Sequence, residues 1–267
     1  PVLQQLKSQE TMIHIGNSYE SDIKGAEEAG IPACHVTDGN LNRYERILGD
    51  YAQETAGMSG KLAGASRYAR LHTRVESTHE EALRDVAAGV MAPVLVGFVT
   101  WLLGRVQQRD LDHLYFTSRD GYHLVPIARR LGSLLEIEGE FEYLYLSRAA
   151  VSAARSASEN AEGKEGTCKR VKAARTRLCR YVKREGLGGD EESGFVDLGW
   201  RGTIHGYLSE ILVEEGLLSS PMPGLFFGLD PDQQIHPSYR TAYFFDKYRG
   251  RGYKDVLPDR GIYTLME

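Results

Sequence analysis

Charged side chains gather at the ends of three apolar segments in the second half of the chain, a pattern typical of ligand-binding sites. The residues are Arg119, Asp120, Arg148, Asp197 and Arg201. An arginine offers a planar fork of N–H donors that suits phosphate or carboxylate. An aspartate can bind a metal ion, accept hydrogen bonds from sugar hydroxyls or act as a general base. We therefore predict a site in which the arginines bind phosphate and the two aspartates are catalytic.

A glycine-rich turn adds backbone donors to this set. Its residues are Gly199, Trp200, Arg201, Gly202 and Thr203. A helix is expected directly after the turn, and backbone N–H groups at a helix N-terminus attract anions, so we predict that the turn binds substrate. The indole of Trp200 offers a surface on which a sugar or base ring can stack. The alternative is a tight turn that only caps the helix.

An alternation of strands and helices is expected to position these residues. Short apolar segments predict strands at 113–117, 141–146, 194–198, 223–229 and 241–245, and amphipathic segments predict helices at 122–131, 168–185 and 204–215. This order is typical of an α/β fold with a doubly wound, mostly parallel sheet. Because such sheets bind ligands at the carboxyl ends of their strands, the charged residues should meet in one crevice if the strands are neighbours.

The start of the chain carries a separate pattern of buried strand, polar turn, helix, glycine stop and second strand. It occupies 12–33, with Ser18 as the predicted N-cap of the helix, Ser21 as a second candidate, and Gly30 as the residue that ends the helix. Asn17 and Asp22 belong to the polar turn and the helix start. The alternative to a metal-binding role for Asp22 is a place in the first helical turn, where the helix dipole stabilises a carboxylate.

This pattern resembles the last conserved motif of the haloacid-dehalogenase (HAD) superfamily. The resemblance implies that Asp22 and Asn17 help to hold Mg²⁺, with Asn17 in place of the family's first Asp. The family's nucleophilic Asp lies in an Asp-x-Asp-x-Thr motif, which does not occur before residue 12. We therefore expect the native protein to extend before Pro1, with a strand ending in Asp-x-Asp, and we expect phosphatase activity only from that longer chain.

Three segments of the second half resemble, as a set, the domain that follows a HAD domain in predicted bacterial hydrolases. They are 114–122, 145–148 and 195–203. That domain is often associated with surface-polysaccharide biosynthesis, so the resemblance implies a role there. Residues 195–203 also resemble, more faintly, the diphosphate loop of phosphoribosyltransferases, although Leu198 stands where that family has a second acidic residue.

Length and composition fit a globular protein of one large or two small domains. The chain has 267 residues, of which 42% are hydrophobic and 26% charged. We predict a partial HAD-like segment at 1–37, a linker or cap-like connection at 38–80 and a second α/β domain at 81–267. Three cysteines without ligand spacing favour a reducing, cytoplasmic setting. The formal net charge of −5 gives no general attraction for nucleic acid, which we do not expect as a partner.

Two segments bear on membrane contact. The uncharged segment 86–103 is long enough to span a bilayer, but flanking charges favour a core helix that is bent or interrupted at Pro93. The segment 168–185 predicts a basic amphipathic helix. Such a helix is either a solvated surface or a contact for anionic lipid, a polyphosphate substrate or nucleic acid, and flanking acidic residues argue against nucleic acid.

Two hypotheses of function follow. The first is a HAD-related protein that acts on or binds a phosphorylated sugar or nucleotide, with Mg²⁺ as cofactor. The second is a non-catalytic scaffold with a degenerate HAD site, which recruits biosynthetic enzymes at an anionic membrane surface. His123 and His205 lie just behind candidate loops and could act as acid or base, but we expect both on helix surfaces. His14 is expected in the core.

Overall fold

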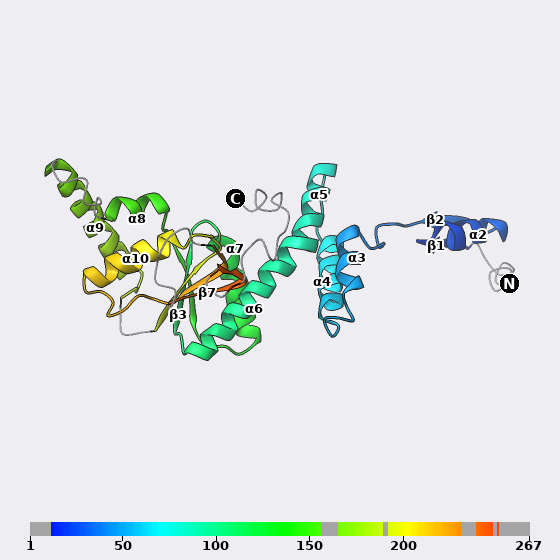
Figure 1. Cartoon of the computed structure of the whole chain (residues 1–267). Coiled ribbons are helices and arrows are strands. Elements are labelled where there is room, and N and C mark those ends of the chain that lie inside the picture. Colours follow the sequence, from blue (N-terminus) through cyan, green and yellow to red (C-terminus); the bar gives the residue numbers. More distant parts are fainter. Residues whose placement is uncertain (1–11, 156–164, 189–191, 231–238, 248–249, 251–267) are drawn as a thin grey trace. The chain divides into compact units, whose positions relative to one another are not determined.

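The computed structural model of the chain describes residues 12–155, 165–188, 192–230, 239–247 and 250 (Figure 1). The chain divides into two compact units, Pro1–Leu95 and Val96–Glu267. It is a mixed α/β protein whose strands pair in parallel. The sequence also predicts a helix before the strand at 12–16, and that segment lies outside the described residues.

The first unit begins with a small parallel sheet, as the sequence predicted. β1 (His14–Gly16) pairs with β2 (Ala33–His35), and η1 (Tyr19–Lys24) and α2 (Gly25–Glu28) connect them. The hydroxyl of Ser18 accepts a hydrogen bond from the backbone N–H of Ser21, which confirms Ser18 as the cap.

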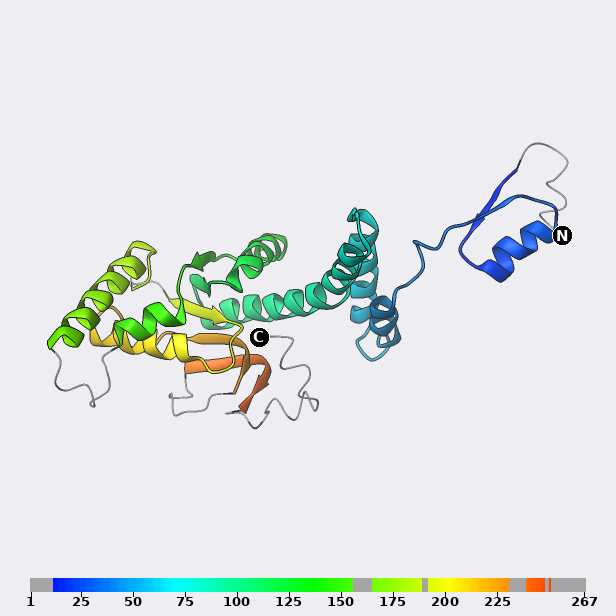
Figure 2. The ribbon, with the colours of Figure 1, turned by 90° about the horizontal axis from the view of Figure 1, so that it is seen from above.

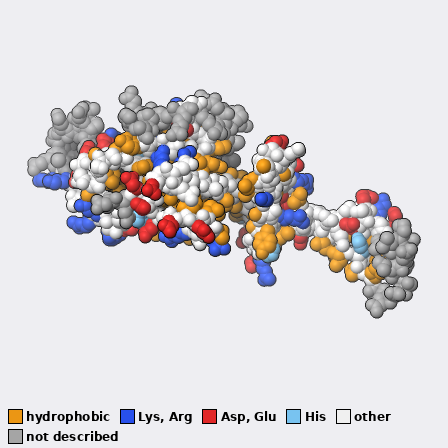
Figure 3. Space-filling view, turned by 90° about the horizontal axis from the view of Figure 1, so that it is seen from below, with side chains coloured by type: hydrophobic (Ala, Val, Ile, Leu, Met, Phe, Trp, Pro, Cys, Tyr) orange, Lys and Arg blue, Asp and Glu red, His pale blue; other side chains and the backbone are white. Residues whose placement is uncertain are grey.

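The prediction of a buried first strand was wrong for the apolar residues next to and within β1. Ile13 and Ile15 are 60% and 62% exposed. The reason is that the short helix between the two strands can cover only one face of this small sheet. The isoleucines therefore lie on the uncovered face and are exposed to solvent. Figure 3 shows hydrophobic side chains on the outside of this N-terminal part of the chain.

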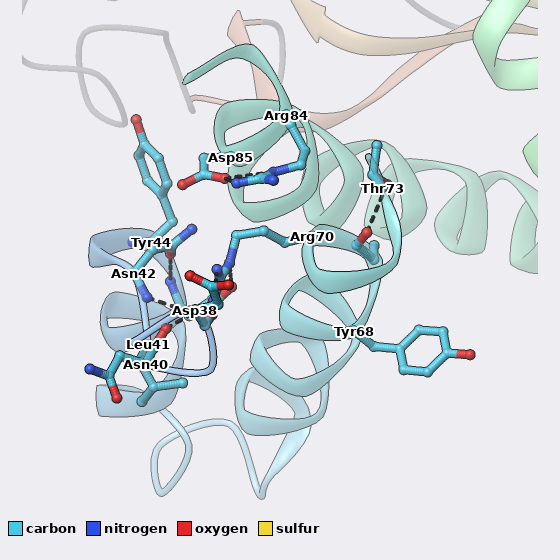
Figure 4. A network of polar contacts seen from close by, with 12 residues as sticks. Asp38, Asn40, Leu41, Asn42, Tyr44, Tyr68, Arg70, Thr73, Arg84 and Asp85 are labelled. Carbon is cyan, nitrogen blue, oxygen red and sulfur yellow. Dashed lines mark hydrogen bonds and ion pairs between the residues drawn. The ribbon is translucent and has the colours of Figure 1, made fainter. Parts of the chain in front are cut away.

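Two helices follow in the region predicted as a connection, α3 (Arg43–Asp50) and α4 (Met58–His72). A buried ion pair joins them: Arg70 on α4 donates to both carboxylate oxygens of Glu45 on α3, at 2.7 and 3.1 Å (Figure 4). The same guanidinium donates to the carbonyl oxygens of Asp38 and Asn40. Asn42 and Glu45 form a capping box at the start of α3. Arg70 therefore fixes the chain that enters α3 as well as the helix itself.

A helical stretch then runs through α5 (Thr78–Val86), the π-helical segment η2 (Ala87–Met91) and α6 (Ala92–Arg109). The predicted interruption at Pro93 is not found, because α6 continues through this residue, but a wider π turn directly precedes the proline. A proline cannot donate the regular helical hydrogen bond, and a π turn accommodates the missing donor.

This stretch, Thr78–Arg109, is the one part of the described chain that is long and apolar enough to cross a membrane, and 28% of its most apolar window is buried. Its second half belongs to a core, with Phe98, Leu102 and Leu103 fully buried. Length and composition alone do not separate a core helix from a membrane helix.

The second unit contains a five-stranded parallel sheet with the order β4-β3-β5-β6-β7. The strands are β3 (His113–Thr117), β4 (Glu140–Leu144), β5 (Ser193–Asp197), β6 (Gly224–Leu229) and β7 (Arg240–Asp246). All five strands predicted from the sequence are present. Their apolar runs are long because both faces of a parallel sheet are covered.

Helices cover the two faces of this sheet. α8 (Arg148–Ala154), α9 (Glu165–Arg184) and α10 (Thr203–Glu214) lie together on one face, over Tyr115, Leu144 and Phe195 (Figures 1 and 2). α6 and α7 (Gly121–Leu134) contact the sheet through other residues, and the ring of Phe98 on α6 meets that of Phe227 edge to face. The second unit is therefore doubly wound, as predicted.

Candidate functional site

The strand order brings the predicted site residues to one edge of the sheet. β3 lies between β4 and β5 and pairs in parallel with both. The chain passes from β3 outward to β4 and then returns across β3 to β5, so the winding direction reverses at the β3–β5 boundary. Ligands of open α/β sheets bind at such a reversal, outside the carboxyl ends of the strands.

A cavity of about 440 Å³ lies at this edge. It is lined by the nine residues of the second half to which the sequence analysis assigned catalysis or substrate binding: Arg119, Asp120, Arg148, Asp197, Gly199, Trp200, Arg201, Gly202 and Thr203. The expectation that these side chains meet in one crevice is confirmed. Their roles in binding and catalysis stay predictions.

Asp197 is the buried carboxyl group of this cavity, with 8% of the residue exposed. Burial raises the pKa of its carboxyl group, and the nearby charge of Asp120 raises it further, against a backbone hydrogen bond from Gly199. That bond joins the Gly199 nitrogen to Asp197 Oδ1 at 3.1 Å. A side chain at Gly199 would place its Cβ 3.2 Å from the other carboxylate oxygen, so the glycine lets the turn approach the acid.

Asp120 is half-buried at the start of α7. Burial also raises the pKa of its carboxyl group, while the charges of Arg119 and His123 oppose the shift. Both carboxyl groups therefore keep their protons to higher pH than an ordinary aspartate does. The pair is thus suited to donate or accept a proton at a bound ligand.

The rim of the cavity is positively charged. Arg119, Arg148 and Arg201 line it and are exposed to solvent. The helices α7, α8 and α10 begin at residues that line the same cavity. Helix N-termini carry partial positive charge and unsatisfied N–H groups. Rim and helix starts together favour an anionic ligand.

A buried network supports the glycine-rich turn from behind. Gly202 has a left-handed φ of 62°, and its carbonyl oxygen accepts a hydrogen bond from Arg240 at 3.0 Å. Arg240 also donates through Nε to His205 Nδ1 at 3.1 Å, and His205 Nε2 lies 2.7 Å from the carbonyl oxygen of Met222. Arg240, the first residue of β7, therefore fixes the turn between β5 and α10.

His205 is a correction to the sequence analysis, because it is 2% exposed and not on a helix surface. Burial and the charge of Arg240 lower its pKa to about 4, so the imidazole is neutral at pH 7. Nδ1 then accepts from Arg240 and Nε2–H donates to Met222. His123 is exposed, as expected. Arg240 was missed, since a single arginine before an apolar strand carries no local signal of burial.

Trp200 has a partner inside the protein. Its ring stacks on Phe245 of β7, with centroids 4.7 Å apart and planes 3° from parallel. One face of the indole is therefore covered, and only the other face could meet a ligand ring. The packing on β7 gives Trp200 a structural role that the sequence analysis did not assign.

The second candidate site, at Asn17 and Asp22, has a different character. Asp22 Oδ2 accepts from the Ser18 backbone at 2.8 Å and Oδ1 accepts from the Ser21 hydroxyl at 3.2 Å. The bond from Ser18 is the main cause that lowers the pKa of Asp22. Asn17 donates through its amide to the side chain of Asn40. His14, predicted in the core, is half-buried, 3.9 Å from Asp22 Oδ1.

These residues do not by themselves form a magnesium site. Mg²⁺ requires about six oxygen ligands in octahedral geometry, and both oxygens of Asp22 already accept hydrogen bonds from its own turn. Among the described residues, no group of three or more Asp, Glu, His or Cys side chains could hold a metal ion. The Mg²⁺ prediction stays untested, and no step below depends on it.

A larger cavity, of about 700 Å³, lies at the opposite edge of the sheet, near the starts of β3 and β4. Its charged lining is acidic: Asp110, Asp112, Glu136, Glu138 and Glu140. His113 also lines it, 2.8 Å from Glu140. Such a lining repels anions, so the smaller cavity at the strand ends is the better candidate for a phosphorylated ligand.

No protein-family model matches the chain, and a search of the curated proteins finds no significant match.

Proposed function

We propose that the cavity at the carboxyl ends of β3, β4 and β5 binds a phosphorylated sugar or nucleotide and acts on it. The observation that carries the proposal is the convergence of three arginines, a glycine-rich helix start and two carboxyl groups on one cavity of about 440 Å³. This volume lies within the range of about 300–1,000 Å³ usual for small-molecule sites.

The chain's own groups suggest a division of roles. The exposed guanidinium groups and the N-termini of α7 and α10 hold phosphate oxygens. Asp197, whose pKa is raised, keeps its proton to higher pH than an ordinary aspartate and serves as the general acid. Asp120, which is less buried, accepts a hydrogen bond from a sugar hydroxyl or acts as the base.

The resemblance to the HAD superfamily and its accompanying domain supports the same substrate class. In this proposal the protein is a cytoplasmic phosphohydrolase or sugar-phosphate-processing enzyme of bacterial surface-polysaccharide biosynthesis. A non-catalytic scaffold is the second candidate. It is favoured by Asp22, whose two carboxylate oxygens are occupied within its own helix start.

The test is calorimetric titration of the protein with a panel of sugar phosphates and nucleotides. Removal of one charge-assisted contact typically costs about 1.5–3 kcal/mol, so Arg201→Ala should weaken binding by roughly tenfold or more. Arg130→Ala is the matched control, because Arg130 is an exposed arginine of α7 that does not line the cavity. Its affinity should equal that of the wild type.

The enzyme and the scaffold then separate by turnover. If a bound compound is also converted, Asp197→Asn should abolish conversion with little change in affinity. Equal affinity of wild type and Arg201→Ala for every compound would remove the anion-binding role. Binding without conversion of any compound would favour the scaffold.

A further inference from the structure

The helix α9 has two faces with different tasks. Its apolar side is part of the core of the second unit, where Leu178, Cys179 and Val182 are buried under the sheet together with residues of α8 and α10. The hydroxyl of Tyr181 accepts a hydrogen bond from the backbone of Tyr145 at 2.7 Å. The helix is therefore fixed by this side and presents its other side outward.

The outward side carries seven exposed basic residues, which we call the basic face: Lys169, Arg170, Lys172, Arg177, Arg180, Lys183 and Arg184. At about 100° per residue they occupy an arc of about 160°, and the helical rise spreads them over about 22 Å. Ala173 and Thr176 are the other residues within this arc. The helix contributes no acidic residue between 169 and 184.

Most of this charge is not neutralised within the protein. Arg175, at the border of the basic face, pairs with Glu214 and Glu215 of the neighbouring helix end, and Arg184 pairs with Glu185. Within the described residues, the remaining members from Arg170 to Lys183 form no salt bridge. Lys and Arg side chains gather at the end of the second unit where Figure 1 places α9 (Figure 3).

We propose that the basic face docks the protein on an anionic lipid surface. Lysines and arginines near a membrane that contains anionic lipids gain about 1 kcal/mol each. Since the apolar stripe of α9 is used in the core, the contact is peripheral and electrostatic. It differs from the insertion of an amphipathic helix, which needs a free apolar side.

Two features favour a membrane over nucleic acid. The basic face carries no aromatic residue on which bases could stack. The first unit also exposes Leu83, Val86, Val90 and Met91 at helical spacing, between 37% and 56%. Exposed apolar side chains are compatible with a bilayer and have no use in binding phosphodiester backbones.

Co-sedimentation with vesicles tests the proposal. The full chain is mixed with phosphatidylcholine vesicles with and without phosphatidylglycerol, at low and at physiological salt. We expect binding only to the anionic vesicles, weakened by salt. The variant R177E/R180E reverses two charges of the basic face and should lose at least about tenfold in affinity. Lys61→Glu with Arg130→Glu is the matched control, since it changes the net charge equally at exposed positions outside α9.

Each outcome of the vesicle experiment either supports or overturns the proposal. Anionic-vesicle binding that falls in R177E/R180E but not in the control supports the proposal. Equal binding to neutral vesicles, no binding to anionic vesicles, or equal loss in variant and control overturns it. Tighter binding to an oligonucleotide than to vesicles, lost in R177E/R180E, would assign the basic face to nucleic acid instead. Both variants alter exposed side chains, and matching thermal midpoints show that they fold.

Discussion

The carboxyl group of Asp197 lies at the buried end of the cavity, and its protonation should affect stability. Burial raises its folded-state pKa above the unfolded value of about 3.9. The folded protein therefore holds this proton to higher pH than the unfolded chain does. The contribution to stability is full below about pH 4 and is lost as pH rises through the folded pKa.

Ionisation of the buried Asp197 carboxyl group at neutral pH costs stability. Asp197→Asn should remove this cost, because the amide stays neutral at every pH. We expect the variant to be more stable than the wild type at pH 7, by about 1–2 kcal/mol. The gain should shrink as the pH falls toward 4. Urea unfolding at a series of pH values measures it. A constant difference between the two proteins across this range would contradict the assignment of a raised pKa to Asp197.

Gly202 offers a second test at the residue scale. Gly202→Ala introduces a Cβ 3.1 Å from the guanidinium of Arg240 at a left-handed φ of 62°. Gly216→Ala is the control, because Gly216 has a similar φ of 67° but open space around it. Both should lose about 1 kcal/mol from backbone strain. Only Gly202→Ala should also lose ligand affinity, by several-fold, because it displaces the turn. Thermal melts and calorimetric titration measure the two effects.

Residue roles were only partly visible in the sequence. The polar residues after β3, β4 and β5 were recognisable because open α/β sheets bind ligands at the carboxyl ends of their strands. The burial of His205 and Arg240 was not, since their bond joins residues 35 positions apart. Nor was the stacking of Trp200 on Phe245. Contacts between residues of distant elements do not produce a periodic pattern of apolar residues in the sequence of either element.

At the scale of elements, α3 and α4 depend on the ion pair between Glu45 and Arg70 (Figure 4). Burial opposes ionisation of Glu45, but the hydrogen bond from Arg70 and one from the Asn42 backbone outweigh it, so its pKa is lowered. This contribution to stability is present above the unfolded pKa of about 4.3 and is lost as pH falls through the folded value.

Arg70→Met should destabilise the first unit by about 3–5 kcal/mol, because it leaves a buried carboxylate without its partner. The double variant Glu45→Leu with Arg70→Met should recover most of this loss, since no buried charge then remains. Urea unfolding of the two single variants and the double variant completes the cycle. Additive losses in the double variant would show that the two side chains do not depend on each other.

Element positions were predicted well where the apolar pattern is long. The strands of the second unit are apolar over most of their length because both sheet faces are covered. α8 was missed, since it is only seven residues long, begins at the site residue Arg148 and consists mostly of alanine. Ser147 was the available signal, because its hydroxyl caps the helix through the Ala150 N–H at 3.2 Å.

For the whole molecule, the order of the strands was the missing information. Local patterns predict that strands exist but not which of them are neighbours. The crevice was expected only on the condition that β3, β4 and β5 lie side by side, and the order β4-β3-β5 fulfils that condition. The right-handed preference of parallel connections narrows such orders but does not fix one.

The division into two compact units gives the last prediction. Units with separate cores usually unfold in separate transitions. Calorimetry of the full chain should therefore show two transitions, and the variants above assign them. Arg70→Met should lower the midpoint of one transition by several degrees or more. Asp197→Asn should raise the midpoint of the other at pH 7. A single cooperative transition that both variants shift would show that the units unfold as one.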